Sequence, residues 1–190
     1  MSQQPTAREL IPLAAQKFTS LVHEVPEERW PTQTPCTEWS VRDLVNHLVA
    51  EHLWAPHVLA GETIEQVGDR YDGDVVGEDP VGAWDSAVAG SLAAFADSEE
   101  DQPVHLSFGT VPVSEYASQM LSDLTVHAWD LARGAGLDER LEEATVAATL
   151  AYTEDHIDVF AGSSLFAEPV EIDSDDPQDR LLALLGRDPR

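Results

Sequence analysis

Apolar residues recur at intervals of three and four along most of this chain, and that spacing predicts helices. The first helix begins after Thr6 and Glu9, which form a capping box. A second capping box, at Ser40 and Asp43, begins a helix that we expect to end near Gly61. In each box a side-chain oxygen accepts a hydrogen bond from a backbone N–H without a partner in the helix, so both starting points follow from local chemistry.

The rest of the pattern predicts more helices and one short extended region. Residues 62–79 are acidic and contain glycine, which predicts a long connection, and Asp79 followed by Pro80 predicts another helix start. The stretch PVHLSFGTVPV, residues 103–113, alternates in polarity and predicts a short hairpin. Further helices are predicted for residues 114–133, 138–161 and 175–186. The sum is an all-α bundle with one long crossover, formed by a single domain over residues 1–190.

Composition limits the location and the partners. The chain has 190 residues, 43% of them apolar, which is typical of a soluble globular domain. No apolar run approaches the ~20 residues that span a membrane, and the N-terminus lacks a secretory signal, so we expect a cytoplasmic protein. The 10 Lys and Arg residues against 36 Asp and Glu residues give a net charge of −26, which argues against nucleic acid and membranes as partners.

The sequence Asp-Leu-x-x-His occurs twice, as Asp43 with His47 and as Asp123 with His127. Residues four apart on a helix differ by ~40° in direction and therefore share a face. Asp43 falls at the third position of its helix, where a carboxylate caps the backbone, and this duty explains it without a metal. His47 lies one turn deeper, between apolar residues, and no capping duty explains it.

Three of these side chains have the chemistry of a metal site. His47, Asp123 and His127 could meet at one end of the bundle, and three N/O ligands leave a coordination position for water or substrate. Asp130 lies seven residues after Asp123, only ~20° off the same line. Zinc is the leading candidate, but the same ligands accept nickel, iron or manganese. An ordinary hydrogen-bonded Asp–His pair is the alternative that this spacing leaves open.

The other histidines and the cysteine are weaker candidates. His52 points ~140° away from His47 around the helix, so it cannot share that face. We expect the five remaining histidines to be solvated or locally hydrogen-bonded, with His105 as the one that could still approach the site: His23, His52, His57, His105 and His156. Cys36, the single cysteine, excludes an internal disulfide, and it is either a reactive thiol near a helix N-terminus or a small half-buried residue.

Three stretches of the chain resemble the signature stretches of an actinobacterial protein family: TPCTEWSVRDLVNHLV, LTVHAWDLARGAG and the terminal DRLLALLGRDPR. That family belongs to the DinB-like superfamily and is related to the amino-terminal domain of mycothiol-dependent maleylpyruvate isomerase. The resemblance covers nearly the whole chain. It implies a DinB-like four-helix bundle of up-down-down-up type, with a divalent metal at one pole.

Carried over residue by residue, the resemblance makes His47, Asp123 and His127 the metal ligands and Asp130 an outer acceptor that orients an imidazole. The isomerase relatives usually have Glu where this chain has Asp123, so the metal is expected to lie closer to the helix or to bind more weakly. The implied function is a metal-dependent, thiol (mycothiol)-dependent transferase or isomerase of a small electrophile, acting as a monomer or homodimer. The alternative is a non-catalytic metal-binding bundle with a stress or ligand-binding role.

The isomerase relatives carry a further C-terminal domain that contributes to their active site. Only residues 162–190 follow the fifth predicted helix of this chain, too few for such a domain. We therefore expect extra C-terminal helices in its place, and an activity other than maleylpyruvate isomerisation. No residue stands out as a general base, although His105 and Asp130 are candidates.

Overall fold

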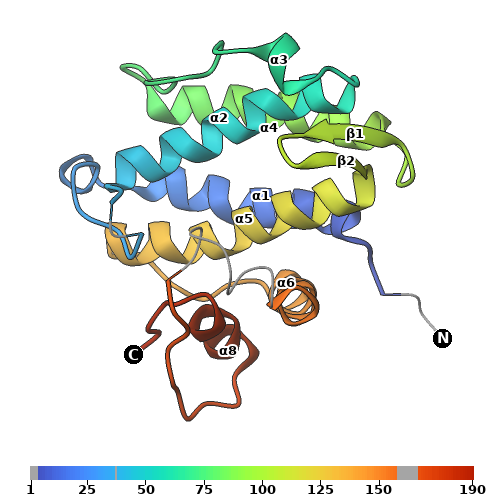
Figure 1. Ribbon diagram of the computed structural model, residues 1–190. Helices are drawn as coiled ribbons and strands as arrows, with labels where there is room; N and C mark the ends of the chain where they lie inside the picture. Colours follow the sequence, from blue (N-terminus) through green and yellow to red (C-terminus); the bar gives the residue numbers. More distant parts are fainter. Residues whose placement is uncertain (1–3, 37, 158–166) are drawn as a thin grey trace.

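The computed structural model describes residues 4–36, 38–157 and 167–190, which are mainly helical with a small two-stranded sheet. Most of the described chain belongs to long helices: α1 (Ala7–Glu24), α2 (Val41–Leu59), α4 (Pro80–Asp97) and α5 (Val113–Ala135). A short 3-10 helix, η1 (Glu27–Arg29), lies between α1 and α2. Helix α1 packs on α5 and α2 packs on α4, and α1 and α5 run opposite to α2 and α4 (Figure 1).

The helix starts lie where their capping residues predicted them. The Thr6 hydroxyl accepts a hydrogen bond from the Glu9 N–H, and the Ser40 hydroxyl accepts one from the Asp43 N–H. In both boxes the carboxylate also accepts a hydrogen bond from the backbone N–H of the capping residue. Helix α4 begins directly after Asp79, whose side chain caps it. These three predictions are confirmed, because capping depends on neighbours in the sequence.

The connection from α2 to α4 crosses back along the molecule, because these neighbouring helices run in the same direction (Figure 1). It contains the short helix α3 (Ile64–Val67) and is tied to α2 by Asn46, whose amide bonds Gly73 O and Val75 N at 2.8 Å each. The predicted hairpin is confirmed as the antiparallel strands β1 (Pro103–Leu106) and β2 (Gly109–Pro112). It packs against α2 and α5.

The C-terminal part adds α6 (Glu143–Asp155) and α8 (Pro177–Leu184), which pack on each other, while α6 also packs on α5. The prediction of one helix over residues 138–161 was wrong at its beginning. There the backbone bonds to side chains, since Leu141 N–H donates to Gln178 Oε1 at 2.9 Å. The end of that predicted helix lies outside the described residues.

The core lies between the long helices, and its largest fully buried side chains include Trp84, Trp129 and Phe18. The Trp84 indole N–H donates to Thr19 Oγ1 at 2.9 Å, so its polar atom is satisfied. Among the described helices, none combines the length and the apolar character needed to cross a bilayer.

Candidate metal centre

The predicted metal ligands lie on two neighbouring helices. His47 belongs to α2, whereas Asp123 and His127 lie one turn apart on α5. The Asp123 carboxylate lies near both imidazoles: its Oδ2 is 3.3 Å from His47 Nε2, and its Oδ1 is 3.3 Å from His127 Nε2. The fold therefore brings these side chains together, although 76 positions separate His47 from Asp123 in the chain.

The spacing of these atoms suits a cation between them. Charge-assisted N–H···O bonds are usually ~2.7–2.9 Å long, whereas two ligands that each lie ~2.0–2.1 Å from a tetrahedral zinc ion are ~3.3 Å apart. One ligand atom from each of His47, Asp123 and His127 lies within 4.8 Å of the others. Asp123 Oδ2 is buried and accepts no hydrogen bond from the part of the chain that the structure describes. A divalent ion would satisfy that oxygen, so these residues fit the implied metal.

The three groups shift one another's pKa. Burial alone would raise the pKa of Asp123. The adjoining His47 and His127 together have the larger effect and lower that pKa to well below its ordinary range. Burial lowers the pKa of both imidazoles, but the Asp123 carboxylate more than offsets this and raises them above the usual value. Because protons compete with a metal for these nitrogens, metal binding should weaken toward acid pH.

Asp130 holds the other nitrogen of His127. The Asp130 side chain is fully buried, and its Oδ2 lies 2.9 Å from His127 Nδ1. The Arg187 guanidinium donates to both Asp130 oxygens, at 2.9 and 3.3 Å. Burial raises the pKa of Asp130, but His127 and Arg187 lower it below its usual value. Asp130 is therefore a carboxylate that accepts the Nδ1 hydrogen, and His127 presents Nε2 toward Asp123.

Cys36 belongs to a second group of potential ligands, with His127 and Asp130, whose ligand atoms also lie within 4.8 Å of one another. The thiol is half-buried, and its Sγ lies 3.4 Å from Arg187 Nη2. A cation in this group would have to displace the guanidinium that already holds both Asp130 oxygens. The group of His47, Asp123 and His127 is therefore the better metal site, and a reactive Cys36 stays a prediction.

Two residues that the sequence did not single out border the centre on its α2 side. The Trp39 ring packs on both imidazoles, with centroids 4.6 Å from His47 and 5.6 Å from His127. Glu51 lies one turn after His47 on α2, and burial and the charge of Asp123 raise its pKa. The i, i+4 spacing of His47 and Glu51 was a signal for a shared face, but an isolated Glu is too common on helices to be singled out.

A cavity of about 260 Å³ lies between the same two helices and the hairpin, and none of the three proposed ligands lines it. Glu51 lines it from α2, and Tyr116 and Gln119 line it from α5, two turns and one turn before Asp123. The hairpin closes one side with Leu106 and Phe108, of which Phe108 is 66% exposed. The cavity thus reaches the surface beside an exposed aromatic ring, and one of its walls is the carboxylate of Glu51, one turn after His47 on α2.

The other histidines lie outside these groups, and one prediction about them was wrong. His52 is fully buried, lies edge-on to Trp84 at 5.0 Å, and neither ring nitrogen has a hydrogen-bond partner among the described residues. The face of α2 that carries His52 packs on α4, so the prediction that His52 is solvated or locally hydrogen-bonded was wrong. The rest are as expected: His57, His105 and His156 bond residues near them in the sequence, and His23 is exposed and pairs with Asp85 of α4. His105 bonds Thr110 across the hairpin and belongs to neither ligand group.

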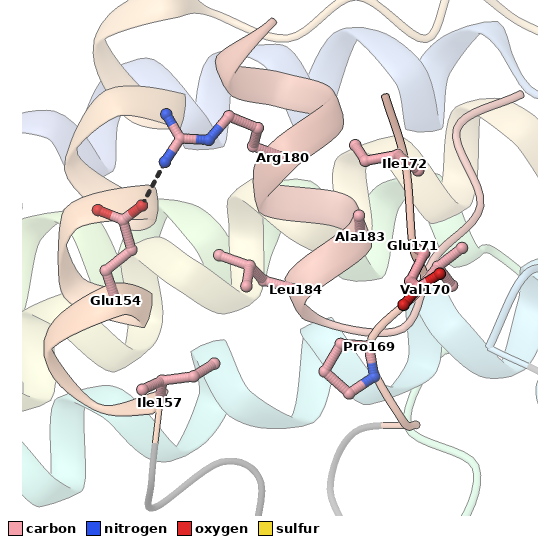
Figure 2. A pocket seen from close by; sticks show the side chains of 9 residues that line it. All are labelled: Glu154, Ile157, Pro169, Val170, Glu171, Ile172, Arg180, Ala183 and Leu184. Atoms are coloured by element: carbon pink, nitrogen blue, oxygen red, sulfur yellow. Dashed lines mark hydrogen bonds and ion pairs between the residues drawn. The ribbon is translucent and has the colours of Figure 1, made fainter. Parts of the chain in front are cut away.

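A larger hollow, about 660 Å³, lies between α6 and α8 (Figure 2). Its walls are mainly apolar, and Arg180 pairs with Glu154 across it at 2.7 Å. It shares no residue with the metal centre or with the cavity beside it. The candidate chemistry therefore lies between α2 and α5.

A family described as the mycothiol maleylpyruvate isomerase N-terminal domain matches residues 11–132, which extend from α1 through most of α5. This chain belongs to that family. The match confirms the resemblance seen in the sequence, and it includes His47, Asp123, His127 and Asp130. It ends before the C-terminal helices, so Arg187 lies outside the matched region.

A protein sequence and a solved structure are also similar to this chain. An uncharacterized protein of Mycobacterium tuberculosis, found in two strains, is 29% identical over 188 residues and covers 92% of this chain and 93% of its own length. The crystal structure of a histidine-to-alanine mutant of the mycothiol-dependent maleylpyruvate isomerase has a similar fold, with a TM-score of 0.59 and 20% identity. That match covers 76% of this chain and 66% of the isomerase, slightly less than two thirds of its length.

Proposed function

We propose that this protein binds a divalent metal ion, with zinc as the first candidate, through His47, Asp123 and His127. We further propose that it uses mycothiol or a related small thiol to transfer or isomerise a small electrophile. The family membership supports the thiol, since the family is described by a mycothiol-using isomerase. The unsatisfied Asp123 Oδ2 and the ~3.3 Å ligand spacing expected around zinc support the metal.

The cavity lined by Glu51, one turn along α2 from His47, is the observation that favours a catalytic role over simple metal storage. A structural metal site is closed, whereas catalysis needs room for a substrate next to the ion. The cavity provides about 260 Å³, with aromatic and aliphatic walls and few polar groups. When bound, a divalent ion would supply positive charge that lowers the pKa of a thiol at its open position.

The chain's own residues would orient and shield the reactants. Asp130 keeps the His127 ring in place through Nδ1, and Trp39 packs on both imidazoles. Glu51 lines the cavity one turn after His47, where it can accept a hydrogen bond or proton from a bound molecule. Its charge and the net charge of −26 disfavour anionic electrophiles, so an uncharged electrophile fits this site best.

We also infer that α1, α2, α4 and α5 form the DinB-like four-helix bundle of up-down-down-up type. The opposite directions of the α1–α5 and α2–α4 pairs support this topology, as does the long crossover between α2 and α4. The proposed ligands meet where α2 and α5 of this bundle pack on each other.

The test combines metal content with thiol conjugation. Protein purified without chelator is analysed for bound metal and then assayed with mycothiol and 1-chloro-2,4-dinitrobenzene, with cysteine as a comparison thiol. We expect His127→Ala to lose both metal and conjugation. His57→Ala is the matched control, because His57 bonds Glu62 and Tyr71 and lies outside both ligand groups.

The outcomes separate the candidate functions. Equal metal content in the wild type and His127→Ala would eliminate the proposed site. A different result would be metal binding that depends on His127 but no conjugation above background with a panel of thiols and uncharged electrophiles. The protein would then be a non-catalytic metal-binding protein.

A further inference from the structure

The C-terminal segment ends at the metal centre. Helix α8 ends at Leu184, and the chain then turns at Gly186, which has a positive φ of 78° and where a side chain would approach Ala167 to 2.7 Å. This turn lets the Arg187 N–H bond Leu182 O at 2.8 Å and directs the Arg187 side chain inward, where it is only 8% exposed. The terminal Gly-Arg stretch, which the proposed function does not otherwise use, therefore places a cation beside α5.

The buried guanidinium is held by several groups. Its Nη2 donates to Asp130 Oδ2 at 2.9 Å and its Nε to Asp130 Oδ1 at 3.3 Å. Nη1 donates to Leu185 O at 2.9 Å, and Nη2 also approaches Cys36 Sγ at 3.4 Å. A charge buried this deeply is retained only with good partners, and the two-oxygen contact with Asp130 is the strong one.

Asp130 Oδ2 accepts hydrogen bonds from two sides, from Arg187 and from His127 Nδ1, each at 2.9 Å. If Arg187 were removed, a fully buried carboxylate would keep His127 as its one remaining charged neighbour in the described chain. Asp130 could then rotate toward other donors, and the His127 ring would be left with weaker restraints: the Cys36 thiol, Asp123 at Nε2 and the packing of Trp39. The orientation of a proposed metal ligand thus depends on a residue 60 positions later in the sequence.

We infer that Arg187 is a positioning residue of the metal centre, which fixes His127 through Asp130 so that Nε2 faces Asp123 and His47. This inference rests on the proposed function for its consequence, which is metal affinity. The contacts on which it depends, from Arg187 to Asp130 and from Asp130 to His127, do not require a metal. Outer partners of this kind typically contribute 10–100-fold to metal affinity.

Arg133 provides a matched control. It also ties α5 to the C-terminal tail, by donating to the backbone oxygens of Asp188 and Pro189 at 2.7 and 3.0 Å. Its other partners are Arg190 O, Glu139 and the Trp129 ring, and within the described chain it bonds neither Asp130 nor His127. Arg133→Met should therefore loosen the tail without releasing Asp130.

The experiment measures cobalt(II) affinity of the full-length protein by visible absorption and, in metal-free protein, the exchange of the His127 Nδ1 hydrogen by ¹⁵N NMR. We expect Arg187→Met to bind cobalt 10–100-fold more weakly and to expose the Nδ1 hydrogen to rapid exchange. Arg187→Lys keeps the charge and should recover part of both, whereas Arg133→Met should match the wild type. If Arg187→Met does not fold, Asp130→Asn combined with Arg187→Gln removes the buried charge pair at similar volume and carries the same expectations.

The inference would be overturned if Arg187→Met, or the double variant, bound cobalt as tightly as the wild type and kept its Nδ1 hydrogen protected from exchange. Equal losses in Arg133→Met and Arg187→Met would also overturn it, because the effect would then be tail attachment alone. If the wild type binds no cobalt, the proposed function fails instead, and the NMR measurement still decides whether Arg187 positions His127.

Discussion

The two Asp-Leu-x-x-His stretches have the same spacing but different surroundings. Asp43 is exposed and, within the described chain, its carboxylate bonds only its capping partner, with Oδ2 accepting from Ser40 N at 3.0 Å and from Ser40 Oγ at 2.6 Å. Asp123 is partly buried and faces one imidazole on its own helix and one on the neighbouring helix. Both carboxyl groups have a lowered pKa, Asp43 through its hydrogen bonds to Ser40 and Asp123 through the two imidazoles that outweigh its burial.

The difference follows from position along the helix. Asp43 is the third residue of α2, where backbone N–H groups still need acceptors, so its carboxylate is used locally. Asp123 lies in the middle of α5, where every N–H is already bonded within the helix, so its oxygens pair with side chains, here His127 one turn later and His47 of α2. A shared motif therefore predicts a shared function only when both copies lie at the same depth in their helices.

The largest expected effect comes from replacing each carboxylate by its amide. Asp123→Asn removes the charge between the two imidazoles, and we expect zinc affinity to fall on the order of 1,000-fold, more than for an outer partner. Asp43→Asn should leave the affinity unchanged. Competition titration against a chromophoric chelator measures both. Equal affinities of the two variants would contradict the assignment of Asp123 as the ligand.

A second comparison lies within α2, between His47 and the buried His52. Burial lowers the pKa of His52 to about 4, whereas an unfolded histidine has its ordinary value of 6.5. As pH falls below 6.5, the unfolded state takes up the proton first. Folding stability is therefore lost progressively down to about pH 4, by up to about 3 kcal/mol.

His52→Leu should remove this component of the pH dependence and should not destabilise the protein at pH 7, because it replaces two unbonded nitrogens with an apolar side chain of similar size. Urea unfolding at pH 7 and pH 4.5 gives the difference between the variant and the wild type. His23→Leu, at an exposed position, is the control. A variant with the same pH dependence as the wild type would show that His52 finds a hydrogen-bond partner in solution.

The sequence was most informative where structure depends on near neighbours. Capping residues located the starts of α1, α2 and α4, and the i, i+4 rule placed Asp123 and His127 on one face of α5. The convergence of His47 with that pair was expected from chemistry and from the resemblance. Spacing alone could not require it, because it depends on how two helices pack.

Features that depend on distant contacts were missed or misjudged. Helical geometry correctly directed His52 away from His47, but it could not show that α4 and Trp84 cover that side. Arg187 reaches Asp130 only because α8 packs on α6 and its last turn reverses at Gly186. Nothing local distinguishes Arg187 from an exposed terminal arginine.

A smaller effect is expected from lengthening the ligand. Asp123→Glu adds one methylene where both carboxylate oxygens already lie 3.3 Å from imidazole nitrogens, so the side chain must bend to fit. We expect zinc affinity to fall about tenfold, or ~1.4 kcal/mol. Asp43→Glu is the control, since Glu also serves in a capping box. Tighter binding by Asp123→Glu would show that the ion lies farther from α5 than the present spacing implies.

The smallest effect should come from the copy without a role in the metal site. Asp43→Ala removes the carboxylate that bonds Ser40, and we expect it to lower the free energy of unfolding by about 1 kcal/mol. Ser40→Ala should cost a similar amount, and the double variant less than the sum, because the two side chains form one capping unit. Thermal unfolding measures the stabilities, and zinc titration of the same samples should match the wild type. A drop in zinc affinity in Asp43→Ala, at unchanged stability, would mean that the first copy acts on the metal centre after all.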